Sequence, residues 1–186
     1  LRRAHRVATV ETWRLSAAQR YAAIRLPAMN EARRKAVEFA FQYVGYPYIY
    51  AGEWHRPTPS GYCCGAQPQG GFDCSGFVWW VVRAPGGGWD NTSYRPYAGW
   101  PLPERSSRDM ARATPERRGW SRMRPMDVMF FDPSGGTGWR GVSHAALWLG
   151  NGWLIDSAGG QGGVTINWGP GSWYRDSFVW ARRVLG

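Results

Sequence analysis

The segment GGFDCSGFVWWVV, residues 70–82, places an aspartate, a cysteine and a serine between a glycine pair and a run of large apolar residues. This pattern predicts a short buried helix over residues 74–83, with Asp73 as its N-cap and Cys74 in its first turn. The first turn of a helix offers free backbone N–H groups and partial positive charge, which favour a thiolate and can bind an oxyanion. A free cysteine can equally be a small buried core residue, so this segment alone leaves both roles open.

A partner base for this thiol is sought among the three histidines. His144 begins the strand-like segment SHAALWLG, whereas His5 lies in a basic N-terminal stretch and His55 in a proline-rich loop. Exposure to solvent is the expected role of the latter two. Because a nucleophilic thiol needs a base within hydrogen-bond reach, we pair Cys74 with His144.

Asp156 is the predicted group that orients the imidazole. Whether it lies on the same face as His144 depends on the geometry of a hairpin around the turn sequence GNG, residues 150–152. A two-residue turn would set Asp156 opposite Leu147, on the face away from His144. A three-residue loop, with its last glycine left-handed in a bulge, would set Asp156 opposite Ala146 and diagonal to His144 on one face. We predict the three-residue loop; the alternative for Asp156 is a solvent-facing polar residue.

Four segments of the chain together carry a family resemblance: PYIYAG, GFDCSGFV, MRPMDVMFF and SHAALWLGNGWLIDSAG. With these segments, the chain resembles the NlpC-type cell-wall cysteine endopeptidases over roughly residues 31–186. The resemblance implies an α+β, papain-like fold, with a helix-borne nucleophile cysteine packed on an antiparallel β-sheet. It also implies hydrolysis of γ-D-glutamyl–diamino-acid or related bonds in peptidoglycan stem peptides. Cys74 would be the nucleophile, His144 the general base and later acid, and Asp156 the orienter. Many relatives carry a histidine or an amide at the third position, but a carboxylate would stabilise an imidazolium equally well.

Three further residues are assigned to substrate binding by the resemblance alone. Tyr48, Asp73 and Ser75 would line the subsite beside the thiol, where related enzymes contact the α-amino group of a free stem peptide. A carboxylate beside a cysteine otherwise opposes thiolate formation. Its presence at Asp73 is therefore explained by a role as the helix cap or as a ligand of the substrate's ammonium group. For Tyr48 the alternative is an ordinary half-buried tyrosine of a strand.

The sequence departs from the family pattern at several places. Glu53 replaces the second glycine of a YGG-like turn, and Met126 replaces the glycine of PGD. The loop over residues 52–71 is longer than the family's link and carries Cys63 and Cys64. This loop would form a cleft wall or a lid. The two cysteines could form a vicinal disulfide, pair with Cys74, or remain free thiols.

The predicted domains are a basic N-terminal helical extension, residues 1–29, and an NlpC-type catalytic domain, residues 30–186, with insertions near 52–71 and 85–106. A helix is predicted over residues 30–44, capped by Asn30. From about residue 125, short apolar runs separated by turn dipeptides predict an antiparallel sheet. The role of the N-terminal helix stays open among a linker, a docking surface and a segment that occludes the cleft.

The formal net charge of +10 suits an anionic wall polymer, although a solvated basic surface is the more ordinary explanation for most of the arginines. No zinc-finger, RNA-recognition or P-loop spacing is present, so we expect no nucleic-acid partner. We also expect no metal, no cofactor, no membrane span and a monomer. A secreted or envelope location is expected, although no signal peptide is visible. The alternatives are an N-acetylmuramoyl-alanine amidase or acyltransferase on the same fold, a non-catalytic wall-binding module, and a lysin or effector with the same chemistry.

Overall fold

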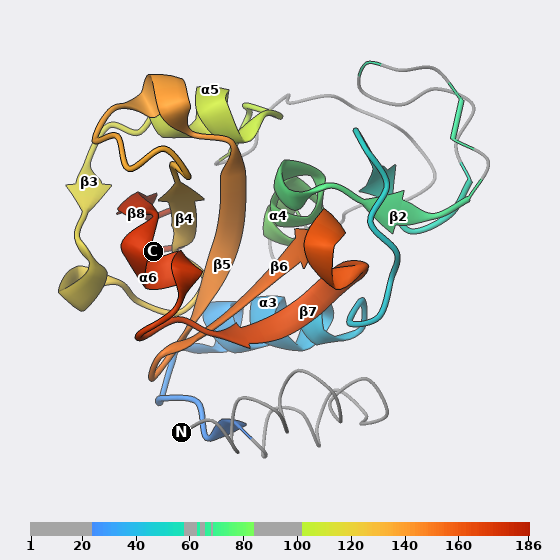
Figure 1. The fold of residues 1–186 in the computed structure, drawn as a ribbon. Helices are drawn as coiled ribbons and strands as arrows, with labels where there is room; N and C mark the ends of the chain where they lie inside the picture. Colours follow the sequence, from blue (N-terminus) through green and yellow to red (C-terminus); the bar gives the residue numbers. More distant parts are fainter. Residues whose placement is uncertain (1–23, 58–62, 64–65, 68, 84–101) are drawn as a thin grey trace.

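The computed structural model describes residues 24–57, 63, 66–67, 69–83 and 102–186, and these residues form an α+β fold around a six-stranded sheet (Figure 1). The strand order is β3-β8-β4-β5-β6-β7, and every neighbouring pair is antiparallel. The strands are β3 (Arg117–Arg118), β4 (Val128–Phe131), β5 (His144–Gly150), β6 (Trp153–Ala158), β7 (Gly163–Trp168) and β8 (Phe178–Arg182). The predicted fold class and the antiparallel sheet are therefore confirmed.

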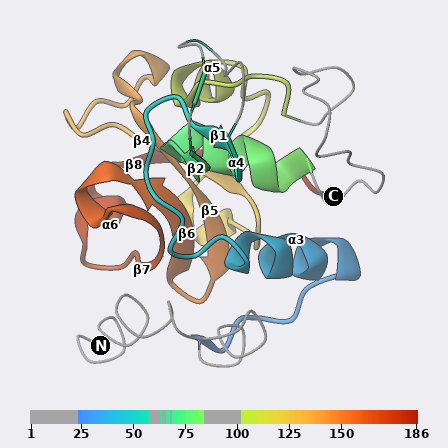
Figure 2. The same cartoon turned by 90° about the vertical axis from the view of Figure 1, so that its right-hand side faces the viewer.

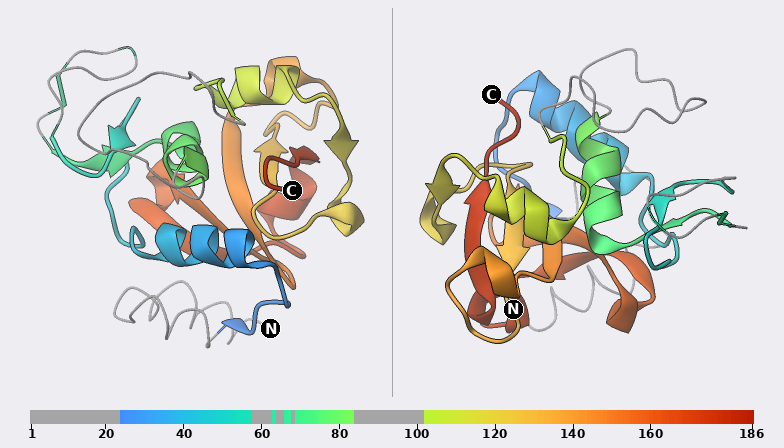
Figure 3. Two further views of the ribbon diagram at one scale, coloured as in Figure 1. Left: turned by 180° about the vertical axis from the view of Figure 1, so that it is seen from behind. Right: turned by 90° about the horizontal axis from the view of Figure 1, so that it is seen from above.

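Helices cover both faces of this sheet. Helices α3 (Glu31–Phe41) and α4 (Cys74–Arg83) pack on one face and bury the larger hydrophobic core beneath them (Figures 1 and 2). The short helix α6 (Trp173–Asp176) closes a smaller core on the other face. Helix α5 (Ser107–Arg112) lies beside the 3-10 turn Trp139–Gly141 at one end of the sheet (Figure 3).

The caps of α3 and α4 follow from their sequences. The Asn30 side chain accepts a hydrogen bond from the backbone N–H of Arg33 at 3.0 Å, and Asp73 Oδ1 accepts one from Gly76 at 2.6 Å. Each bond satisfies a backbone donor that the first turn of a helix leaves free. Both predicted helices are confirmed, but α3 ends at Phe41, before the predicted residue 44, and single turns continue the chain to Gly45.

The turn between β5 and β6 is tighter than predicted. Gly150 pairs with Trp153, so only Asn151 and Gly152 lie between the strands, with left-handed φ values of 51° and 91°. The register then shifts between Trp148 and Gly150, which puts the extra residue in β5 and not in the turn. The predicted three-residue loop is therefore wrong, since a two-residue turn follows a bulge.

The position predicted for Asp156 is nevertheless confirmed. Beyond the bulge, Leu147 pairs with Ile155, which sets Asp156 opposite Ala146. That position is diagonal to His144 on the same face of the sheet. A bulge moves the register by one residue, as the longer loop would have done, so either device brings these two side chains together.

Other predicted segments are only partly described. The region 52–71 was predicted as a loop, but its two ends pair as a short ladder of β1 (Glu53–Trp54) and β2 (Gly71–Phe72). The predicted N-terminal helix and most of the insertion near 85–106 lie outside the described residues, and the domain boundaries stay a prediction. Among the described residues, no helix combines the length and apolarity that crossing a bilayer requires.

Candidate active site

The thiol of Cys74 lies at the first residue of α4, and the surrounding backbone fixes that helix end. The N–H of Asp73 donates to the Gly52 carbonyl at 2.9 Å, which ties the start of α4 to the preceding strand region. A Cβ atom on Gly76 would collide with that same carbonyl, so the glycine of the DCSG motif permits this close approach. Cys74 is only 9% exposed, and its thiol is free.

His144 stands at the start of β5, with its ring between Asp156 and Cys74. Its Nε2 atom lies 2.6 Å from Asp156 Oδ2, which leaves the other ring nitrogen, Nδ1, for the thiol. Burial lowers the pKa of His144, but hydrogen bonds to Asp156 and Cys74, and the charges of both groups, outweigh burial and raise this pKa from 6.5 to about 10. The arrangement therefore favours a protonated imidazole beside the thiol.

The other described histidine differs from its prediction. His55 was expected to be solvated, but it is half-buried and packs against Trp80, with ring centroids 4.9 Å apart. Burial lowers the pKa of His55. It is therefore a neutral component of an aromatic cluster and not a partner of the thiol, whereas His5 lies outside the described residues.

Asp156 is fully buried and is held by side chains that the sequence did not single out. Its Oδ2 also accepts a hydrogen bond from the Tyr174 hydroxyl at 3.0 Å, and its Oδ1 accepts one from Asn167 Nδ2 at 2.8 Å. Gln161 in turn donates to the Tyr174 hydroxyl and accepts from Asn167. This network fixes the carboxylate with one oxygen aimed at the imidazole. The alternative of a solvent-facing Asp156 is wrong.

A pocket of about 230 Å³ opens beside the thiol. Tyr48, Asp73 and Ser75 all line it together with Cys74, so the structure brings the three predicted substrate-binding residues to one place. Burial, followed by the charges of Cys74 and Asp73, raises the pKa of Tyr48, so this phenol stays neutral. We call this concavity the thiol pocket.

Arg105 is the residue of the thiol pocket that sequence reasoning missed. Its buried guanidinium pairs with Glu53 and with Asp73 Oδ1, the latter at 3.1 Å, and donates to Ser75 Oγ at 2.9 Å. Burial lowers the pKa of Arg105, but the two carboxylates outweigh it and raise this pKa. Glu53, a departure from the family pattern, is thereby explained as a counter-ion. The sequence placed one acid, Asp73, in the predicted subsite, and a carboxylate in a closed site is a signal that a cation accompanies it.

The state of Cys63 decides among the three alternatives predicted for the cysteines of the long loop. Cys63 is disulfide-bonded and Cys74 is not, so neither a free thiol at Cys63 nor a bond that silences Cys74 is correct. Cys64 lies outside the described residues. Because Cys63 lines the thiol pocket, the long loop contributes to a wall of this pocket at that point.

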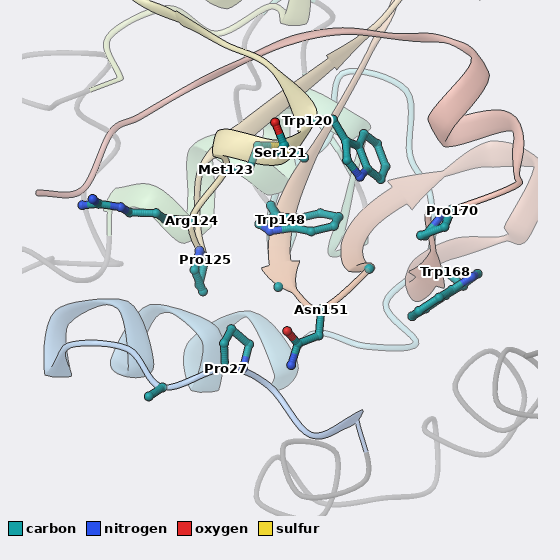
Figure 4. A pocket seen from close by; sticks show the side chains of 13 residues that line it. Pro27, Trp120, Ser121, Met123, Arg124, Pro125, Trp148, Asn151, Trp168 and Pro170 are labelled. Carbon is teal, nitrogen blue, oxygen red and sulfur yellow. The ribbon is translucent and has the colours of Figure 1, made fainter.

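Two further concavities differ in chemistry. One, of about 480 Å³, is lined by His144, Gln161, Trp173 and Tyr174 and adjoins the thiol pocket at Ser143. The other, also about 480 Å³, lies at the turn between β5 and β6, among the rings of Trp120, Trp148 and Trp168 (Figure 4). Among the described residues, no His, Cys, Asp or Glu lines this distant pocket.

Comparisons with known proteins agree with this geometry. Residues 45–183 match the model of the NlpC/P60 family. The chain is 30% identical over 150 residues to the peptidoglycan endopeptidase RipB of Mycobacterium tuberculosis, which covers 78% of this chain and 52% of RipB. It is 28% identical over 145 residues to the gamma-DL-glutamyl hydrolase of Bacillus subtilis, which covers 76% of this chain and 27% of that protein. The chain thus spans about half or less of these relatives.

Solved structures share the fold. An NlpC/P60 family protein from Bacillus cereus superposes with a TM-score of 0.61 at 24% identity, covering 87% of this chain and 41% of that one. RipD of Mycobacterium tuberculosis, described as a non-catalytic NlpC/p60 domain protein adapted to peptidoglycan binding, superposes with a TM-score of 0.56 at 19% identity. That alignment covers 84% of this chain and all of RipD. The same fold therefore carries both catalytic and non-catalytic members.

Proposed function

The chain belongs to the NlpC/P60 family, a family of peptidoglycan hydrolases, and we propose that it is a cysteine peptidase acting on the stem peptides of peptidoglycan. The bond we propose is the γ-D-glutamyl–diamino-acid linkage. The observation that carries the proposal is the row formed by the free Cys74 thiol, the His144 ring and the buried Asp156 carboxylate. This is the arrangement of nucleophile, base and orienting group that thiol acyl transfer needs.

The proposed reaction starts from a Cys74 thiolate beside the His144 imidazolium. Cys74 Sγ attacks the carbonyl carbon, and the resulting oxyanion lies at the N-terminus of α4, where no described contact uses the N–H of Cys74. The tetrahedral intermediate collapses as the C–N bond breaks, and the leaving nitrogen takes the imidazolium proton. Water then attacks the thioester and gives a proton to the neutral His144, and the C–S bond breaks. The products are the free acid, the thiolate and the imidazolium.

The thiol pocket would hold the acyl part of the substrate. Asp73 presents its carboxylate to the thiol pocket beside Cys74. A free α-ammonium group of a stem peptide would pair with that carboxylate. We therefore propose that Tyr48, Asp73 and Ser75 contact the amino end of the acyl part, and that Arg105 fixes the carboxylate in place.

Two alternatives remain distinct from this proposal. An N-acetylmuramoyl-alanine amidase or an acyltransferase would use the same three residues and differ only in the bond cleaved or in the acceptor. A wall-binding module, as the description of RipD illustrates, would need no nucleophile. The raised pKa of His144 beside the free thiol favours catalysis over binding alone.

The proposed place of action is the cell envelope. The net charge of +10 would favour contact with an anionic wall, and RipB is by name a peptidoglycan enzyme. Retention of the protein on purified wall material should accordingly fall as salt increases.

Digestion of purified peptidoglycan tests the function. The wild-type protein and the Cys74→Ala variant are incubated with the polymer, and the released fragments are identified by mass. We expect fragments cut after γ-D-glutamate from the wild type alone. Equal release by both proteins would refute the thiol mechanism, and a cut between sugar and L-alanine would indicate the amidase. Polymer that is bound but uncut by the wild type would indicate the binding module.

A further inference from the structure

The pocket beside His144 lies on the opposite side of the reacting atoms from the thiol pocket. The thiol pocket contains Cys74 and not His144, whereas the second pocket contains His144 and not Cys74. Ser143 lines both pockets, so they form two halves of one cleft on either side of the dyad. We call the second one the histidine pocket.

The chemistry assigns each half to one part of the substrate. The acyl group stays bonded to Cys74 after the C–N bond breaks, so it must occupy the thiol pocket. The leaving amine takes its proton from the His144 ring, so it must depart on the side of that ring. The residue that carries the leaving amine therefore faces the histidine pocket.

An exposed tryptophan forms the wall of the histidine pocket. Trp173 is 45% exposed and stacks on Phe131, with ring centroids 5.6 Å apart and an interplanar angle of 28°. Its ring centroid lies 5.8 Å from that of His144. Among the described residues only one other large apolar side chain is exposed, Tyr50 at 75%, and it lines the thiol pocket. Each half of the cleft thus presents one aromatic ring to solvent.

The rest of the histidine pocket offers no fixed charge to a ligand. Its other lining groups include Pro133 and Ala158, and apart from His144 no acid or basic amine lines it among the described residues. The polar atoms of Gln161 are engaged, since its amide donates to the Tyr174 hydroxyl and its oxygen accepts from Asn167. The Tyr174 hydroxyl donates to Asp156. Apolar contact is therefore what this surface supplies.

We propose that the histidine pocket binds the residue released with the amine, and that Trp173 selects a leaving residue with a long aliphatic side chain. The methylenes of a diamino acid lie along the indole face, and the terminal polar group extends past it into water. This assignment rests on the proposed peptidase function and adds the selectivity of its leaving side. It makes Trp173 a specificity residue, whose effect depends on the length of the chain and not on the charge at its end.

Two synthetic tripeptides test this selectivity. L-Alanyl-γ-D-glutamyl-L-lysine and the same peptide ending in L-alanine differ in the methylene chain of the leaving residue and in its terminal ammonium group. The released amino acid is measured by mass spectrometry. From the burial of part of that chain, we expect the wild-type kcat/KM to favour the lysine peptide by about tenfold. Trp173→Ala should bring the ratio close to one, and Trp173→Phe should restore most of it. Replacing lysine by norleucine, which keeps the chain and removes the charge, should preserve the preference.

Trp168→Ala is the matched control, because Trp168 lines the distant pocket at the far end of β5, and it should leave the ratio unchanged. A ratio that Trp173→Ala does not alter, or a preference that norleucine abolishes, overturns the proposal. If the wild type cleaves neither peptide, the proposed function fails, and binding to Cys74→Ala with and without Trp173→Ala is measured by calorimetry. Weaker binding of the lysine peptide alone then supports the pocket assignment, and equal loss for both peptides refutes it.

Discussion

The pH dependence of Asp156→Asn is the sharpest test of the proposed site. The His144 pKa of about 10, compared with 6.5 for an ordinary histidine, corresponds to a preference of about 5 kcal/mol for the imidazolium. Among the interactions that raise this pKa, the hydrogen bond to Asp156 is the largest. An opposite charge at this range moves a pKa by about 1–3 units, so the neutral amide should lower the pKa of His144 by about that amount. The substitution keeps the volume of the side chain, removes its charge and replaces one of its two acceptor oxygens by an amide donor.

The sign of the effect on activity follows from the proton that His144 must hold. In the wild type the imidazolium loses its proton as the pH rises through about 10, so kcat/KM falls on that basic limb. In Asp156→Asn the same limb should move down by about 1–3 pH units.

The matched control for this experiment is Asp132→Asn. Asp132 is also buried, but it accepts hydrogen bonds from Ser134 and makes no described contact with His144. The basic limb of the kcat/KM profile of Asp132→Asn should lie at the same pH as that of the wild type. If folded Asp156→Asn keeps the wild-type basic limb, then Asp156 does not set the protonation of His144, and the reasoning is wrong.

Three further substitutions test the surroundings of the site. Arg105→Met should lower the free energy of unfolding by about 3–5 kcal/mol in urea titrations, because it leaves the Glu53 and Asp73 carboxylates without their buried cation; a loss under about 1 kcal/mol would contradict the assigned ion pairs. Adding Glu53→Gln to Arg105→Met should recover part of that loss. Tyr174→Phe removes the hydroxyl 3.0 Å from Asp156 Oδ2 and should lower kcat/KM about tenfold, with an unchanged kcat/KM speaking against a positioning role. Met126→Gly relieves a left-handed φ of 69°, worth about 1–2 kcal/mol, but removes a fully buried side chain worth about 2–5 kcal/mol. We therefore expect a net loss of stability by thermal unfolding, and a stabilised variant would show that strain prevails there.

The parts of the site that local sequence rules could predict are those that local geometry fixes. Asp73 caps α4 because a short acidic side chain precedes an apolar run, and that places Cys74 in the first turn whatever the rest of the fold does. His144 and Asp156 share a face because strand side chains alternate with a period of two. The predicted length of the turn was wrong, but the predicted face of Asp156 was right. A bulge and a longer loop shift the register by the same single residue.

The residues that were missed act across long distances in the chain. Tyr174 reaches Asp156 from α6, and Arg105 reaches Glu53 from a segment 52 residues away. No periodicity or cap relates such pairs, because their contact depends on how the elements pack. His55 was misplaced for the same reason, since a proline-rich neighbourhood suggests exposure and only packing brings Trp80 against the ring.

The cluster around Arg105 resolves the difficulty of an acid beside a nucleophilic thiol. An unpaired carboxylate at Asp73 would oppose the formation of a thiolate on the next residue. The Arg105 guanidinium reaches both oxygens of Asp73, at 3.1 and 3.2 Å, and thereby offsets that charge where it matters most. Glu53 then holds the guanidinium from its other side, which a glycine at this position could not do. The departure at Glu53 thus stabilises the arginine that makes Asp73 compatible with catalysis.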